Sequence, residues 1–170
     1  MVKRTRRETF VKLRLWQMNL AFTHEQLTLE TIATTLNGAY VATKIIMLQA
    51  GTNHEHQVAE ACLDDMKFQI MPGRKDDIVF RSYIPFSSNY KEQNLRKAAD
   101  FLDNYSVDMT YVASLDDGRH LMCFHLNHVI PEDETISPAY LVKLSRYFVK
   151  VVHQHLDNWP VIESMACGPA

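Results

Sequence analysis

The 170-residue chain has few cysteines, and no group of residues in it has the spacing of a known catalytic or metal-binding motif. Its cysteines, Cys62, Cys123 and Cys167, are odd in number and form no C-x-x-C, which argues against a disulfide framework and a structural zinc site. No run of about 18 apolar residues is present to span a bilayer. The basic N-terminus lacks the apolar segment of a signal peptide. We therefore expect a cytoplasmic protein without a membrane span or cofactor.

Charge is distributed unevenly along the chain. With 46% hydrophobic and 22% charged residues, the composition is that of an ordinary globular protein long enough to bury a core. The formal net charge is -2, but the first fourteen residues carry +5 and leave -7 for the remainder. The cations of this basic arm are Lys3, Arg4, Arg6, Arg7, Lys12 and Arg14. A basic arm on an acidic body is the main charge feature.

Two alternating runs, residues 109–115 and 120–127, predict a β-hairpin. Asp117-Gly118 between them suits a two-residue turn, because such a turn requires positive φ and glycine accepts it without steric cost. That turn would place Tyr111 opposite Phe124 on an apolar face. A register shift of one residue would scatter this face over both sides of the hairpin, so the pattern and the turn support each other.

The opposite face of the expected hairpin mixes polar and apolar side chains. Its apolar members in this register are Val112, Leu121 and Cys123. A mixed face is either exposed to solvent or the floor of an interface. No sequence pattern indicates a base that would activate Cys123, so we expect a packed thiol rather than a nucleophile.

A long amphipathic helix follows the hairpin. Ser137 and Pro138 predict its start, because serine caps an orphan amide and proline has no amide to leave unpaired at the first helical position. Apolar residues at three- and four-residue steps continue to Trp159 and form a stripe that would cover a sheet. Pro160 is expected to end the helix. Residues 161–170 would form a flexible tail.

Patterns along the remaining chain predict alternating helices and strands. Expected helices span 8–22, 23–36 and 89–104, and expected strands span 40–49, 67–71 and 77–86. Residues 54–66 have weak helical spacing and indicate an irregular helix. A capping box at Thr23 to Gln26 would start the second helix, and Gly38 in a left-handed conformation would close it.

Antiparallel strands punctuated by helices on one side predict the α+β class, a twisted antiparallel sheet with helices packed mainly on one face. We expect three parts. Residues 1–38 would form an N-terminal helical pair that carries the basic arm, residues 39–160 the α+β body, and residues 161–170 the tail.

The order of elements from Ile78 onward is similar to that of a known family. The patterns that carry the likeness are a helix ending in Phe101-Leu102-Asp103-Asn104, a hairpin with Leu115-Asp116-Asp117-Gly118, and Ile136-Ser137-Pro138-Ala139-Tyr140-Leu141 opening the last helix. In this respect the chain resembles the YbjN-like family, which shares the type III secretion chaperone-like fold. The resemblance implies a strongly twisted sheet in an often dimeric protein-binding chaperone or regulator without catalytic residues.

Eight histidines raise the possibility of a metal site. His54 and His56 are two residues apart, as are His153 and His155. Residues two apart share a face on a strand but diverge by about 200° on a helix, so the second pair is a poor chelator. No H-E-x-x-H or cysteine partner accompanies either pair. Adjacent carboxylates lie in or beside expected turns, where they would be solvated.

These patterns favour a non-enzymatic protein-binding domain, chaperone-like or adaptor-like, that forms a homodimer. It would capture a partner segment on a sheet face or edge left uncovered by helices. The expected contacts are Val112, Leu121 and Cys123, with Trp16 and Tyr40 in addition. The alternative is a regulator that binds nucleic acid through the basic arm, with Trp16 available for stacking. A metal-dependent enzyme that uses the histidines is the third hypothesis.

Overall fold

The computed structural model describes residues 21–73, 76–87, 89–105, 109–114, 119–131 and 134–168. Its elements, in chain order, are η1 (His24–Gln26), α2 (Leu29–Gly38), β1 (Ala42–Leu48), β2 (His56–Leu63), β3 (Met66–Pro72), β4 (Asp77–Phe86), α3 (Glu92–Tyr105), β5 (Met109–Ser114), β6 (His120–Val129), α4 (Pro138–Asp157) and α5 (Trp159–Cys167).

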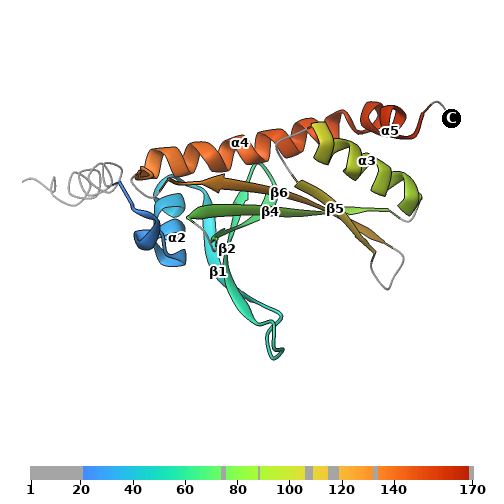
Figure 1. Cartoon of the computed structure of the whole chain (residues 1–170). Coiled ribbons are helices and arrows are strands. Elements are labelled where there is room, and N and C mark those ends of the chain that lie inside the picture. The colour runs from blue at the N-terminus through green and yellow to red at the C-terminus, as the bar shows by residue number, and fades with distance from the viewer. Residues whose placement is uncertain are drawn as a thin grey trace, which may run out of the picture.

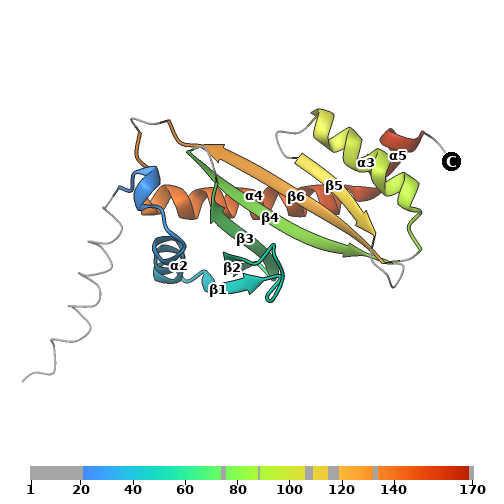
Figure 2. The same ribbon diagram turned by 60° about the horizontal axis from the view of Figure 1, so that its bottom comes forward.

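The described strands form one six-stranded antiparallel sheet in the order β1-β2-β3-β4-β6-β5. The helices lie on one side of this sheet. Helix α4 runs along it, α2 lies at one end, and α3 and α5 lie side by side at the other end (Figure 1). The second view shows the same arrangement, with β5 beside α3 (Figure 2). The expected α+β class, with helices on one face of an antiparallel sheet, is confirmed.

Strand pairing aligns a continuous apolar row on the helix-covered side. The row is Ile45–Ala59–Ile70–Phe80–Leu126, one residue from each of five strands. All but Ile45 are buried. Because side chains alternate along a strand, this row also determines which residues point the other way.

Several local predictions are confirmed. Ser137 Oγ accepts a hydrogen bond from the Tyr140 amide at 3.1 Å, and Pro138 is the first residue of α4. The expected inward residues of β4 lie in the core, namely Ile78, Phe80 and Phe86, or pack against it, as Ile84 does. The expected inward residues of α3 are buried as well: Leu95, Ala98, Ala99 and Leu102.

The C-terminal segment differs from its prediction. Residues 161–167, expected in a flexible tail, belong to helix α5, which buries Trp159 and Ile162 in the core. Pro160 explains both the end of α4 and the start of α5. It cannot continue α4, which ends at Asp157, but it is well suited to the first turn of the helix that follows.

The hairpin register was predicted wrongly by one residue. Ser114 pairs with His120, so the strands are linked by a five-residue loop and not by a two-residue turn. In the observed register Val112 is opposite Met122, and Cys123 is opposite Tyr111. By this register, Val112 and Cys123 belong to opposite faces of the hairpin. The expected turn residues lie outside the described part of the chain.

The irregular helix expected over residues 54–66 is also wrong, because β2 occupies this segment. Its partner β3 follows after a turn at Asp64 and Asp65, whose φ angles are +49° and +61°. Two consecutive left-handed residues form the type of tight turn that matches strand twist, and aspartate tolerates this conformation better than most residues. Pairing with β1 and β3 then overrides the weak helical spacing.

The N-terminal predictions are partly corrected. The capping box is present, with the Thr23 amide donating to Gln26 Oε1 at 3.1 Å, but it closes the short η1 turn. Helix α2 begins only at Leu29. It includes Gly38, and the left-handed residue beyond it is Tyr40, with φ +63°. Phe22, placed at the end of an expected helix, forms an isolated β-bridge with Ile136. The rest of that expected helix lies outside the described residues.

Phe148 joins α4 to the sheet. It is 1% exposed, and its ring centroid lies 5.9 Å from that of Phe68 and 5.7 Å from that of Phe80. We expect Phe148→Ala to lower the free energy of unfolding by about 3–5 kcal/mol, because it removes a buried ring and leaves a cavity. Urea unfolding measures this loss. Tyr147→Ala, at an exposed neighbouring position, should change stability by only about 0.5 kcal/mol. Equal losses in both variants would contradict the assigned packing.

Candidate functional site

The second face of the sheet has no helix over it in the described part of the chain. Strand pairing aligns a polar row across it: Lys44–Glu60–Gln69–Arg81–His125. At one end of this row Lys44 Nζ lies 3.2 Å from Glu60 Oε1. We call this surface the open face.

Apolar residues lie on both sides of the polar row. Met71 pairs with Val79 on one side, and Tyr83 pairs with Cys123 on the other. Val79 and Cys123 are buried although no described helix covers them, whereas Tyr83 is 38% exposed. The open face therefore combines an apolar floor with a line of hydrogen-bonding groups, as in many ligand-binding surfaces.

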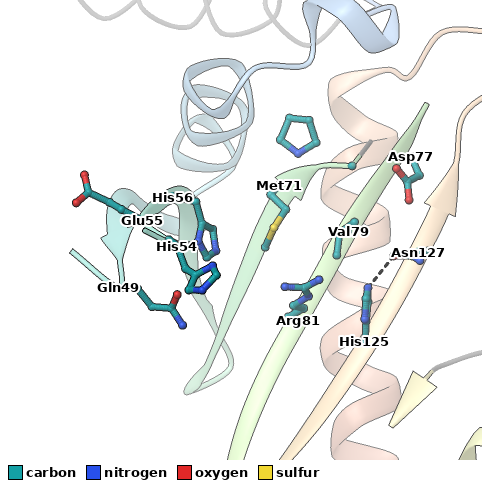
Figure 3. Close-up of a pocket in the computed structure, with 12 residues that line it drawn as sticks. Gln49, His54, Glu55, His56, Met71, Asp77, Val79, Arg81, His125 and Asn127 are labelled. Carbon is teal, nitrogen blue, oxygen red and sulfur yellow. Dashed lines mark hydrogen bonds between the residues drawn. The ribbon is translucent and has the colours of Figure 1, made fainter. Parts of the chain in front are cut away.

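A pocket of about 820 Å³ lies on the open face. The β1–β2 turn lies across from β4 and β6 and forms one wall (Figure 3). The lining residues are Gln49, His54, Glu55, His56, Met71, Pro72, Gly73, Asp77, Val79, Arg81, His125 and Asn127.

Hydrogen bonds within the β1–β2 turn hold its residues in place. Thr52 Oγ1 donates to the Gln49 carbonyl at 2.7 Å, and the Gly51 amide donates to Glu55 Oε2 at 2.8 Å. His56 Nδ1 lies 2.8 Å from the His54 carbonyl oxygen. Because a carbonyl only accepts, Nδ1 carries the proton, and Nε2 of a neutral His56 is an acceptor.

On the opposite wall, His125 Nε2 lies 2.7 Å from Asn127 Oδ1. Burial lowers the pKa of His125, and the nearby positive charge of Arg81 lowers it further, against the opposing effects of the Asn127 hydrogen bond and the Asp77 charge. His125 is therefore neutral near pH 7, and Arg81 provides the fixed positive charge on this wall.

Arg81 Nε is buried and has no hydrogen-bond partner among the described residues, and the same holds for Oε1 of Gln69, the cross-strand neighbour of Arg81. A buried polar atom without a partner costs about 1–3 kcal/mol. Such atoms are rare in folded proteins and require an explanation, for which a bound group or water is the usual one.

The open face includes some of the contact residues expected from the sequence. Leu121 is half-buried there, and Cys123 is fully buried at its floor. The side chain of Val112 is not among those described. Tyr40 is 83% exposed at the connection between α2 and β1, away from the pocket residues. Trp16 and the basic arm lie outside the described residues, so the nucleic-acid hypothesis stays a prediction.

Sequence patterns did not bring the pocket residues together. The His54-x-His56 spacing and the place of His125 and Asn127 on the mixed face of the hairpin follow from the sequence, but separately. The structure brings these two groups together with residues of β4, more than twenty positions from His56 along the chain. The outward positions of the alternating β4 segment, which include Arg81, were the available signal. Which strand would lie opposite them is not encoded in that alternation.

Among the described residues, no group of three or more His, Cys, Asp or Glu side chains is arranged to hold a metal ion. The His155 ring of α4 stacks on the Phe124 ring of the sheet, with the ring centroids 5.9 Å apart. None of the three cysteines, all of which are described, forms a disulfide. No helix in the described ranges has the length and apolar character needed to cross a membrane.

No family model matches the chain, and no curated protein matches it. Among solved structures, the chain is similar to YbjN from E. coli, described as a candidate transcription regulator. The likeness has a TM-score of 0.43 and 11% sequence identity, and it covers 81% of this chain and 90% of YbjN. The YbjN-like resemblance inferred from sequence is thus found again, over a segment and at low identity.

Stability should depend on pH through two histidines. Burial lowers the pKa of both His125 and His128 from the ordinary value of 6.5. The unfolded chain therefore binds these protons at a higher pH than the folded chain. The stability they contribute is fully present above pH 6.5 and is lost as the pH falls toward and through the lowered folded values. We expect Tm to fall between about pH 7.5 and pH 5.5.

The double variant His125→Gln, His128→Gln should show a smaller fall in Tm over this range. His54→Gln, at an exposed position of the β1–β2 turn, is the matched control and should retain the wild-type fall. Thermal scans at several pH values measure both. An unchanged pH dependence in the double variant would show that other groups are responsible.

Proposed function

We propose that the protein is a non-enzymatic binding module, chaperone-like or adaptor-like, whose open face captures an extended segment of a protein partner. The observation that carries this proposal is the one-sided covering of the sheet. The helices bury one face, while the other presents a polar row between apolar residues and is hollowed by a pocket. A surface of this composition fits a peptide, which brings both apolar side chains and backbone hydrogen-bonding groups.

The expected affinity is moderate. An apolar side chain that becomes fully buried contributes about 1.5–3 kcal/mol, so two or three anchors on the apolar rows contribute about 3–9 kcal/mol before the entropy cost of ordering the segment. A dissociation constant of 1 μM corresponds to about 8 kcal/mol. Binding in the micromolar range or weaker is therefore expected unless polar contacts add to it.

Peptide selection tests the proposal. Peptides are selected from a random 12-residue library on the immobilised protein, and the amide NMR shifts caused by a selected peptide are mapped. We expect the shifts to concentrate in β3, β4 and β6. Tyr83→Lys should weaken binding about tenfold or more, because it places a charge among the apolar contacts of the open face.

Tyr147→Lys is the matched control, since Tyr147 is 48% exposed on α4, the helix-covered side. It should leave the dissociation constant unchanged. Shifts confined to the helices, or equal weakening by both lysines, would contradict the proposal.

A homodimer, which the sequence resemblance implies, is also part of this proposal, as is a location in the cytoplasm. Sedimentation equilibrium tests the dimer, with an expected mass twice the 19.7 kDa of one chain. A mass of one chain at all accessible concentrations would exclude it.

A further inference from the structure

Arg81 is a cation without a counter-ion in the part of the chain that the structure describes. Its cross-strand neighbours are Gln69 and His125, and neither is an anion. The one carboxylate of the polar row, Glu60, already pairs with Lys44 at 3.2 Å. A guanidinium in a partly buried position is normally paired, because removal from water is otherwise costly.

The two acidic residues that line the pocket lie away from its centre. Glu55 accepts a hydrogen bond from the Gly51 amide at 2.8 Å, and its side chain points away from Arg81 (Figure 3). The Asp77 carboxylate lies against Gly73, so closely that a Cβ at Gly73 would stand 1.7 Å from Asp77 Oδ1. Among the described residues neither carboxylate forms an ion pair with Arg81, although the Asp77 charge acts on the neighbouring His125.

The groups near Arg81 suit a singly charged anion. His125 already uses Asn127 Oδ1, which leaves the Asn127 amide nitrogen to donate to a ligand. One fixed cation with one neutral donor matches a carboxylate, whereas a phosphate dianion is usually held by several cationic groups. Met71 and Val79 line the same pocket, and apolar walls strengthen such an ion pair.

We infer that the pocket binds the side-chain carboxylate of an aspartate or glutamate in the partner segment, with Arg81 as its main contact and Asn127 as a second donor. This inference rests on the proposed function and specifies the chemistry of the partner. A charge-assisted hydrogen bond is stronger than a neutral one, so the acidic residue would select which segments bind.

The test repeats the peptide selection on wild type, Arg81→Gln and Arg146→Gln. Arg146 lies exposed on α4, on the other side of the sheet, and is the matched control. Peptides selected by wild type and Arg146→Gln should be enriched in an acidic residue at one position, and those selected by Arg81→Gln should not. Changing that residue to its amide in a synthetic peptide should weaken binding to wild type about tenfold and leave binding to Arg81→Gln unchanged.

Three results would overturn the inference. Peptides that bind the open face with no acidic preference would exclude the carboxylate site and leave the proposed function standing. Failure to select any peptide that maps to the open face would overturn both. N-acetylglutamate that binds wild type as tightly as the selected peptide would show that the pocket takes a free small acid and not a partner segment.

Discussion

The contact between α4 and one face of the sheet is the interaction on which the rest of the structure depends. Phe148 packs its ring against Phe68 and Phe80, and the apolar row through Phe80 extends this contact across five strands. Because side chains alternate along each strand, burial of this row forces the intervening residues onto the opposite side. The open face is thus a direct consequence of the core.

The same pairing explains why polar groups gather on the open face. Each strand contributes an outward residue next to its inward one, so the register that aligns Phe80 with Leu126 also aligns Arg81 with His125. The β1–β2 turn, held by its own hydrogen bonds, adds His54 and His56 from the far end of the sheet. A change that shifted one strand by a single residue would exchange the two faces and remove the pocket.

Sequence reasoning succeeded where the signal is local. The Ser137-Pro138 start of α4, the inward residues of α3 and the alternation of β4 all depend on neighbours a few positions away. It failed where distant pairing decides. The β2 segment has weak helical spacing that pairing with two strands overrides. Two further errors have local causes: the hairpin loop has an odd length that shifts its register, and Pro160 lies in the first turn of a second helix where a tail was expected. The pocket could not be found because distant pairing creates it: it joins residues from four strands and from the β1–β2 and β3–β4 connections.

Photo-crosslinking in cells tests the central claim, that the open face is the surface that meets a partner, most directly. A photoreactive phenylalanine analogue is placed at Tyr83 on the open face or at Tyr147 on α4, which are exposed to similar extents of 38% and 48%. The account predicts crosslinked partner protein from position 83 and none above background from position 147. Crosslinks from position 147 alone, or equal crosslinks from both positions, would contradict it.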